Sequence, residues 1–267
     1  MGQKFYSGLI TKSLFDDIYR LRRQNTEDKS FMLYYHKKLD NYKHEYSLQK
    51  SLEIEIGMVK NFRRRKIYRL LLSNMYSAWA YLRSKKSRVI NIQDILEVNN
   101  LVNNDLTADA GFRTGNAWIQ GATHPTVAAH KIQQELTTVF NVLANSNISV
   151  IERAFLYHFH IARIHPFIDG NGRTARLIQD YKLLINDFPP AGIPLHERAQ
   201  YISLLDSACC AYIDLKNEFD DKAYVSRIDY PHEYLILNNS RKEIVGLMDF
   251  LAEKVKYNLE EILGLVR

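Results

Sequence analysis

Glycine, proline and cysteine are scarce in this chain. Its 267 residues include 11 glycines, 6 prolines and 2 cysteines. Turn-rich β proteins need many residues of the first two types, so their scarcity argues against such a fold and favours helices. Hydrophobic residues make up 46% of the chain, which is enough to bury a core and argues against a disordered protein.

The two cysteines, Cys209 and Cys210, are adjacent and therefore poorly suited to a structural disulfide. No apolar run approaches the length that spans a bilayer. The segment Gly2–Tyr6 leads directly into charged residues, which is not typical of a signal peptide. These features predict a cytoplasmic protein that does not enter a membrane.

Positive charge exceeds negative charge, with a net value of +6 and an isoelectric point near 9.1. Basic residues gather at Arg63–Lys66, near the start of a long helix expected over 61–82. A nucleic-acid partner is one interpretation, and it predicts an affinity that falls steeply with salt. Because no nucleic-acid-binding motif accompanies these residues, a solvated basic helix face is the preferred interpretation.

The chemically richest stretch of the chain is HPFIDGNGRTAR, at residues 165–176, between two segments with apolar residues at helical spacing. Gly170, Asn171 and Gly172 tolerate positive φ, so their successive backbone N–H groups can form a nest for an anion. The helix that follows adds its N-terminal N–H groups and its dipole. The stretch therefore predicts a phosphate-binding site.

Four side chains add charge and proton transfer to this site. Arg173 and Arg176 are three residues apart and are expected to share a helix face, from which each guanidinium group can bind a phosphate. Asp169 can hold Mg²⁺ together with the phosphates, and His165 can accept a proton from a hydroxyl group. The expected chemistry is phosphoryl or nucleotidyl transfer from a nucleoside triphosphate to an alcohol.

The same residues resemble the Fic family motif, His-x-Phe-x-acid-Gly-Asn-Gly-Arg-x-x-Arg, at every fixed position. Fic proteins are mostly AMP transferases that move AMP from ATP to a Ser, Thr or Tyr hydroxyl and release pyrophosphate. The resemblance implies that His165 is the base, Asp169 the Mg²⁺ ligand and Phe167 an apolar plug. It assigns phosphate binding to Gly170, Asn171, Gly172, Arg173 and Arg176. The related Doc-type kinases carry Lys where this chain has Gly172, so nucleotidyl transfer is favoured over phosphorylation.

A short upstream segment, Ser51–Glu55, resembles the inhibitory helix of Fic proteins, whose pattern is Ser/Thr-x-x-x-Glu followed by Gly or Asn. The resemblance implies that Glu55 pairs with Arg176 and holds ATP in an unproductive pose. Ile56 departs from the family pattern. An ordinary helix with solvated glutamates is the alternative interpretation.

Residues 105–125 break the helical pattern and predict a short β-hairpin, because Ala117, Trp118 and Ile119 have strand propensity and glycines flank them. The resemblance implies a flap whose exposed strand edge pairs with a segment of the target protein, with Trp118 and Ile119 as docking residues. Gly111–Arg113 and Gly121–Pro125 look like the elements that open and close this flap.

Other candidates lie in the helices around the motif. Arg198 and Tyr201 resemble an Arg-x-x-Tyr pair that borders the nucleotide base in Fic proteins, although the body of Tyr201 also fits a core position. His158 and His160 invite a metal-site interpretation with His165. Residues two apart point to different sides of a helix, which favours ordinary histidines of a core helix.

These observations predict an all-α fold, a Fic-like helical core with a short β-hairpin flap. The core is expected over 47–222, including the candidate inhibitory helix 47–57, between helical extensions 1–46 and 223–267. The apolar stripe Ile244, Leu247, Leu251 and Val255 fits core packing or contact in a homo-oligomer.

The resemblance predicts Mg²⁺-dependent transfer of AMP from ATP to a hydroxyl of a target protein or of the chain itself, restrained by an N-terminal helix. One alternative is the transfer of UMP, phosphocholine or phosphate on the same scaffold. Another is a non-catalytic regulator that binds a nucleotide or a partner.

Overall fold

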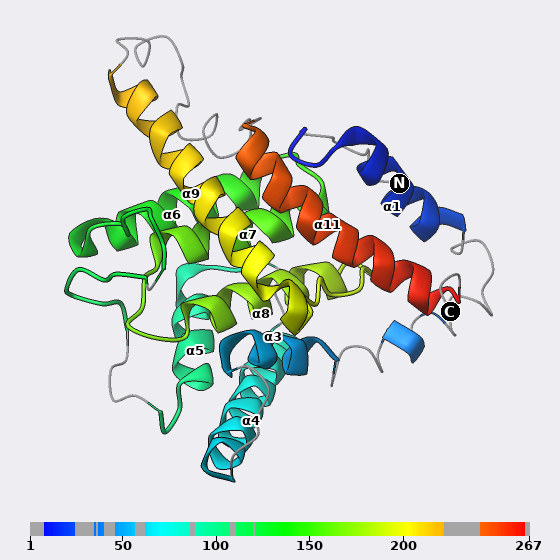
Figure 1. The fold of residues 1–267 in the computed structure, drawn as a ribbon, viewed down its shortest axis with the longest axis horizontal. Coiled ribbons are helices and arrows are strands. Elements are labelled where there is room, and N and C mark those ends of the chain that lie inside the picture. Colours follow the sequence, from blue (N-terminus) through cyan, green and yellow to red (C-terminus); the bar gives the residue numbers. More distant parts are fainter. Residues whose placement is uncertain are drawn as a thin grey trace.

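The computed structural model describes residues 8–24, 35, 37–39, 46–56, 62–85, 89–106, 111–119, 121–221 and 241–264. Its α-helices are α1 (Lys12–Gln24), α3 (Tyr46–Ile56), α4 (Phe62–Ser84), α5 (Ile92–Val102), α6 (Ile132–Asn145), α7 (Val150–Ile164), α8 (Asn171–Leu184), α9 (Arg198–Asp221) and α11 (Lys242–Ile262). Single 3-10 turns, Ala129–Lys131 and Leu195–Glu197, precede α6 and α9. The predicted helical fold is confirmed (Figure 1).

Helices α7 and α8 form the centre of the fold and pack against each other. Nearly every side chain of both helices is buried. A helix buried all round must be covered from several sides. The helices α3, α4 and α5 contact α8, while α6 and α11 contact α7. The short connection between α7 and α8, which carries the motif, is therefore held by the most enclosed part of the molecule.

Side-chain caps fix where two of these helices begin. Asn91 Oδ1 accepts from Asp94 N (3.0 Å) and Asp94 Oδ2 accepts from Asn91 N (2.8 Å), a reciprocal capping box at the start of α5. Ser149 Oγ accepts from Glu152 N (3.2 Å) at the start of α7. Both helices contribute directly to the candidate site at their other end.

The two terminal helices pack together on one side of the core, with α1 beside α11 in Figure 1. Thr11 N donates to Asp249 Oδ1 (2.6 Å), and Lys256 Nζ lies 2.9 Å from Asp17 Oδ2. Helix α11 also packs against α9 and α7. The helices predicted as separate extensions thus share the buried core, and the predicted boundary at residue 222 lies outside the described residues.

The predicted β-hairpin is not confirmed, because residues 111–119 and 121–128 contain no strand. We call these residues the flap loop. It is closed by two hydrogen bonds, Ala122 N to Ile119 O (3.0 Å) and Thr126 Oγ1 to Ala117 O (2.7 Å). Local turn and side-chain hydrogen bonds therefore satisfy carbonyl groups that a strand ladder would otherwise use.

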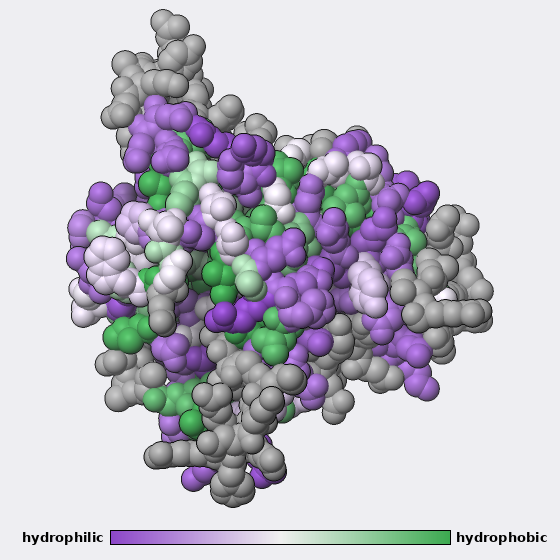
Figure 2. Space-filling view, viewed as in Figure 1, coloured by the Kyte–Doolittle hydropathy of each residue, from purple (hydrophilic) through white to green (hydrophobic). Residues whose placement is uncertain are grey.

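No helix in the described ranges is long and apolar enough to cross a membrane. On the face shown in Figure 2, hydrophobic residues occur in small groups between hydrophilic ones.

Candidate functional site

The candidate site lies where α7 ends and α8 begins. Helix α7 ends at His165, whose backbone is left-handed (φ 52°) and whose N–H donates to Ile161 O (3.0 Å). The chain then passes through residues 166–170, which we call the motif loop, and enters α8 at Asn171. The residue predicted as the base and the N-terminus of α8 therefore lie at one end of the central helix pair.

Gly170 is the turning point of the motif loop. Its φ of 78° favours glycine, and a Cβ there would lie 2.7 Å from Asn103 Nδ2 and 2.9 Å from Asn99 Nδ2. Asn171 and Gly172 already belong to the first turn of α8, so Gly170 alone supplies the positive φ expected of the nest. The N–H groups at the start of an α-helix lack intrahelical acceptors, so they, rather than a nest of three residues, are the groups that could bind an anion here.

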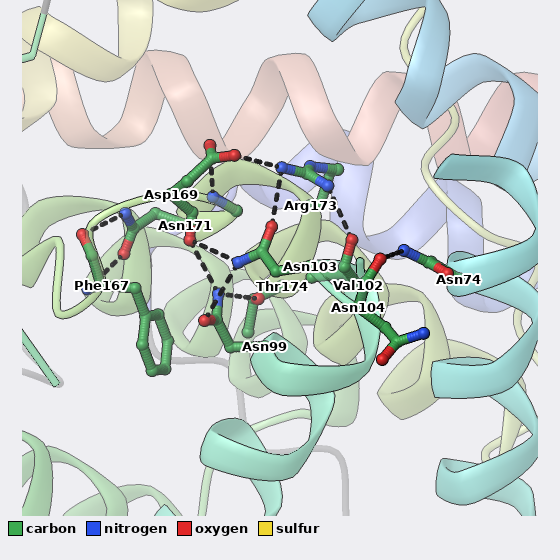
Figure 3. Close-up of polar contacts among 11 residues, drawn as sticks. Asn74, Asn99, Val102, Asn103, Asn104, Phe167, Asp169, Asn171, Arg173 and Thr174 are labelled. Carbon is green, nitrogen blue, oxygen red and sulfur yellow. Dashed lines mark hydrogen bonds and ion pairs between the residues drawn. The ribbon is translucent and has the colours of Figure 1, made fainter. Parts of the chain in front are cut away.

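The side chain of Asn171 braces the motif loop from within. Its Oδ1 accepts from Phe167 N (2.9 Å) and its Nδ2 donates to Phe167 O (2.9 Å), as Figure 3 shows. Phe167 is 1% exposed and its ring lies 5.7 Å from that of Phe112. This asparagine acts on the loop through its side chain, while its backbone belongs to the helix N-terminus.

Two buried asparagines of α5, which the motif does not include, support the loop from the other side. Asn99 Nδ2 and Asn103 Nδ2 each donate to the carbonyl oxygen of Asp169 at 3.0 Å. Asn99 Nδ2 also lies 3.1 Å from Thr174 Oγ1 (Figure 3). The only sequence signal is their spacing of four, which places two amides on one face of a helix.

The side chains of Asp169 and Arg173 bond to each other at the mouth of the loop. Arg173 Nη2 lies 2.9 Å from Asp169 Oδ2, and Arg173 Nη1 donates to Val102 O (2.8 Å). The Asp169 carboxylate is 53% exposed and its Oδ1 accepts from Gly170 N (2.6 Å). Arg173 thus joins the motif to the end of α5 (Figure 3). The half-exposed carboxylate of Asp169 remains accessible to solvent.

Arg176 points to a different neighbour from Arg173. Its Nε donates to Ser51 Oγ (2.7 Å) and its Nη2 to Ser51 O (3.1 Å), both on α3. The two arginines, three residues apart on α8, therefore bond to different elements, Arg173 to the end of α5 and Arg176 to α3. That both bind phosphate from one helix face stays a prediction. Arg176 meets the helix predicted to be inhibitory.

Helix α3 is also held at its C-terminal end, where the guanidinium of Arg198 donates to Ile54 O. Glu55 belongs to α3, but its side chain lies outside the described residues. The predicted pair between Glu55 and Arg176 therefore remains a prediction. The structure adds that the serine one turn earlier already contacts that arginine.

His165 has an environment suited to a neutral base. Burial, and then the charge of Arg113, lower the pKa of His165 from 6.5 to about 4. Arg113 Nε donates to His165 O (2.7 Å) and Arg113 N to Pro166 O (2.9 Å). One arginine of the flap loop therefore fixes the backbone of the histidine and favours its uncharged form.

The other end of the flap loop is fastened to α9 by Asp206. Its carboxylate accepts from Thr123 N (2.9 Å), from Thr123 Oγ1 (2.6 Å) and, at 2.6 Å, contacts Nδ1 of His124. Burial raises the pKa of the Asp206 carboxyl group, but the hydrogen bonds from Thr123 and His124 together outweigh it, so the pKa is lowered. Between the two fastened ends, Trp118 is 87% exposed and Ile119 is half-buried.

His124, Asp206 and Cys210 lie close enough to suggest a metal site. The 2.6 Å separation of His124 Nδ1 and Asp206 Oδ1 is that of a hydrogen bond, and both oxygens of Asp206 already accept from Thr123. The cluster is therefore explained as the attachment of the flap loop.

Tyr201 belongs to the core rather than to the motif loop. It is 3% exposed, and its hydroxyl lies 2.7 Å from Nε2 of His158, whose Nδ1 lies 2.6 Å from Gln179 Oε1. His160 contacts Arg163 at 3.4 Å. The core interpretation of His158 and His160 agrees with these contacts, and the predicted nucleotide contact of Tyr201 stays a prediction.

The fold and this site define a helical protein with a histidine at the end of one buried helix and a five-residue loop leading from it to the N-terminus of the next. The sequence profile of the Fic/DOC family matches residues 89–183, which span α5, the flap loop and nearly all of α8. The chain therefore carries a Fic/DOC domain.

Curated relatives agree with this assignment. Protein adenylyltransferase fic-1 of Caenorhabditis elegans is 34% identical over 187 residues, which cover 66% of this chain and 36% of that protein. Protein adenylyltransferase Fic of Drosophila willistoni is 31% identical over 139 residues, covering 51% and 26%. The chain thus spans only about a quarter to a third of the length of these relatives.

Solved structures share the fold at lower identity. Fic-1 of C. elegans (residues 134–508) superposes with a TM-score of 0.61 at 22% identity, covering 95% of this chain and 72% of that one. A Fic family protein from Desulfovibrio desulfuricans G20 gives a TM-score of 0.60 at 14% identity, covering 98% and 76%. The helical arrangement extends beyond the residues of the family profile.

Proposed function

We propose that the protein is an adenylyltransferase that transfers AMP from ATP to a Ser, Thr or Tyr hydroxyl of a protein. The observation that carries the proposal is the position of His165, half-buried at the end of α7 and next to the loop that leads into the N-terminus of α8. The names of the curated relatives support the choice of donor, and Gly172 supports AMP transfer over phosphorylation.

In the proposed reaction the target hydroxyl oxygen attacks the α-phosphorus of ATP and His165 accepts the hydroxyl proton. The bond between the α-phosphorus and the bridging oxygen breaks, and the electron pair leaves with pyrophosphate. The first N–H groups of α8 would hold the phosphates during this step, and Arg176 would stabilise the charge of the leaving group. Arg173 contributes by holding Asp169 and the end of α5.

Asp169 fits a magnesium ligand, because its carboxylate is a hard oxygen donor, half exposed and adjacent to the phosphate-binding turn. Mg²⁺ bound there would neutralise charge on the triphosphate. The bond from Arg173 Nη2 to Oδ2 restrains the orientation of this carboxylate.

We further propose that α3 restrains the reaction. Contacts from Ser51 engage Arg176, and Arg198 holds the carbonyl of Ile54. Glu55 would complete the restraint by pairing with the same arginine. An arginine bound to α3 is not available to orient the terminal phosphates.

The target protein would dock on the flap loop, close to His165. Support comes from the exposure of Trp118 and from the attachment of both ends of this loop, by Arg113 to the motif and by Asp206 to α9. A loop held in this way can accept an extended target segment without losing its position relative to the base.

The test compares wild type, Glu55→Gly and Glu55→Gly/His165→Ala with α-labelled ATP and Mg²⁺, reading label on the protein itself. We expect little label in wild type, strong label in Glu55→Gly and none in the double variant. Equal label in wild type and Glu55→Gly would contradict the restraint and keep the transferase. No label in any sample, with ATP, UTP and CDP-choline tried in turn, would contradict the proposed function.

A further inference from the structure

A pair of buried amides stands behind the motif loop. Asn99 and Asn103 lie one turn apart on or just beyond α5 and are 3% and 5% exposed. Both donate to one acceptor, the carbonyl oxygen of Asp169, at 3.0 Å each (Figure 3). Two side-chain donors on a single loop carbonyl fix its direction more firmly than one.

This contact sets the orientation of the turn into α8. A trans peptide unit is planar, so its C=O and N–H groups point in opposite directions. With the carbonyl of Asp169 drawn toward α5, the N–H of Gly170 points away from α5, where Asp169 Oδ1 accepts it at 2.6 Å. The peptide before Gly170 therefore determines how the following N–H groups meet an anion.

The same amides reach the first turn of α8. Asn99 Nδ2 lies 3.1 Å from Thr174 Oγ1, and Asn103 Oδ1 accepts from Arg173 Nη2 (3.0 Å). Asn103 Nδ2 also lies 3.3 Å from Asn99 Oδ1. The two amides thus link the loop carbonyl, the helix start and each other into one buried network, in which loss of one member leaves others unpaired.

Gly170 shows how closely the network follows the loop. A Cβ at Gly170 would approach Asn103 Nδ2 to 2.7 Å and Asn99 Nδ2 to 2.9 Å. The amides therefore occupy the space that a side chain at the turn would need, and they contact the loop on the face opposite the N–H groups.

We propose that Asn99 and Asn103 are positioning residues of the anion site. They orient the N-terminal N–H groups of α8 and so determine how tightly the phosphates of a nucleotide are held, without contributing to the binding of its nucleoside part. The inference rests on the proposed function in one respect, that the ligand is a nucleotide.

The experiment measures dissociation constants for ATP and for adenosine on the full chain, by calorimetry, with Asn103→Ala and Asn103→Asp as the variants. Asn103→Asp retains an acceptor for Arg173 and loses the donor to Asp169, while Asn103→Ala loses both without adding charge. The matched controls are Asn100→Ala and Asn100→Asp, at an exposed position of the same helix. Asn99→Ser, which keeps a small polar group, is the second variant should changes at Asn103 prevent folding.

We expect both Asn103 variants to bind ATP about tenfold more weakly, because both lose the buried hydrogen bond to Asp169. Adenosine affinity should be unchanged and the controls should match wild type. Unchanged ATP affinity in Asn103→Ala would overturn the inference, even with weaker binding in Asn103→Asp, because the effect would then be one of charge. An equal loss for ATP and adenosine would also overturn it, in favour of a purely structural role. Absence of ATP binding in wild type would instead contradict the proposed function.

Discussion

At the scale of single residues, the site depends on two backbone positions with positive φ. His165 ends α7 at φ 52° and Gly170 begins α8 at φ 78°. Each is held from outside the motif. The guanidinium of Arg113 bonds to the carbonyl of His165, and the amides of Asn99 and Asn103 bond to the carbonyl of Asp169, in the peptide that precedes Gly170. The motif residues are therefore necessary for the site, but their geometry depends on residues in α5 and in the flap loop.

The depressed pKa of His165 leads to the first prediction. Burial and Arg113 lower it to about 4, with smaller opposing or reinforcing effects of Asp169 and His124. The base is active when deprotonated, so activity is present above this pKa and is lost as pH falls through it. We expect the acid limb of kcat/KM near pH 4, more than two pH units below that of an unperturbed histidine.

The measurement is kcat/KM from about pH 3 to 8, with far-UV circular dichroism at each pH to confirm folding. His165→Ala should lower the rate by about 10²–10⁴-fold at every pH, as for loss of a general base. An acid limb centred near pH 6.5 would contradict the assigned environment.

Gly170 leads to a second prediction at this scale. In Gly170→Ala, the new Cβ would lie within 3.0 Å of atoms of Asn99 and Asn103, at a φ that disfavours side chains. We expect the free energy of unfolding to fall by about 1–3 kcal/mol, measured by urea denaturation. The control is Gly246→Ala, where the nearest atom, Leu204 Cδ2, is 3.8 Å away. Equal effects at the two glycines would argue against the close contact.

At the scale of elements, α3 and the flap loop flank the junction of α7 and α8. The sequence predicted a helix over Ser51–Glu55 and a pair between Glu55 and Arg176. The structure has the helix and a contact of Ser51 with Arg176, and the Glu55 pair stays a prediction. The sequence alone could not show that residues 111–119 and 121–128 of the flap loop contain no strand. Strand propensity at Ala117–Ile119 is a local preference, whereas long-range bonds from Arg113 and Asp206 determine the conformation of this segment.

The contact of α3 with Arg176 gives the third prediction. Ser51→Ala removes the hydroxyl that accepts from Arg176 Nε at 2.7 Å and leaves the backbone acceptor in place. We expect auto-modification to rise by about tenfold or more, because a single hydrogen bond to a charged group contributes about 1.5–3 kcal/mol. The rise should be smaller than in Glu55→Gly. Glu53→Gln, on the same helix and paired with Lys50 at 3.6 Å, is the control and should match wild type. Lower activity in Ser51→Ala would mean that α3 supports the site.

The attachment of the flap loop gives the fourth prediction. Asp206→Asn weakens the acceptor of Thr123 and His124, so the downstream end of the loop should become looser. We expect slower modification of a protein target with unchanged affinity for ATP, because Asp206 contacts the flap loop rather than the motif loop. Asp214→Asn, at an exposed position of α9, is the control. A change in ATP affinity alone would contradict a role in target docking.

At the scale of the whole molecule, most of the helices could be predicted from apolar spacing, but their partners could not. The apolar face of α1, with Phe15 and Ile18, shows that the helix buries one side without showing where. Its partner α11 lies more than 200 residues away in the sequence. The hydrogen bond between Thr11 and Asp249, for example, joins residues that are 238 positions apart. Likewise, the asparagines of α5 look like ordinary helix-end residues until the fold brings Asp169 against them.

The buried histidines of the core couple global stability to pH. His158 is fully buried between Gln179 and Tyr201, and burial lowers its pKa from 6.5 to about 4. Burial also lowers the pKa of His160 well below its usual value. In the unfolded chain these residues take up protons near pH 6.5, whereas in the folded protein they do not. The folded state is therefore favoured fully above pH 6.5 and loses this stability as pH falls toward 4.

The last prediction follows from the size of that coupling. A shift of this size at His158 corresponds to roughly 3 kcal/mol of stability lost between pH 6.5 and 4. We expect urea denaturation curves to show a free energy of unfolding that declines over this pH range. His158→Gln should make this decline smaller. The same variant should lower the free energy of unfolding at pH 7, because the amide cannot keep both hydrogen bonds. His196→Gln is the control, since the His196 side chain is 80% exposed. If the free energy of unfolding has the same pH dependence in wild type and in His158→Gln, other groups dominate acid unfolding. The core histidines would then have no part in limiting the pH range in which His165 can act.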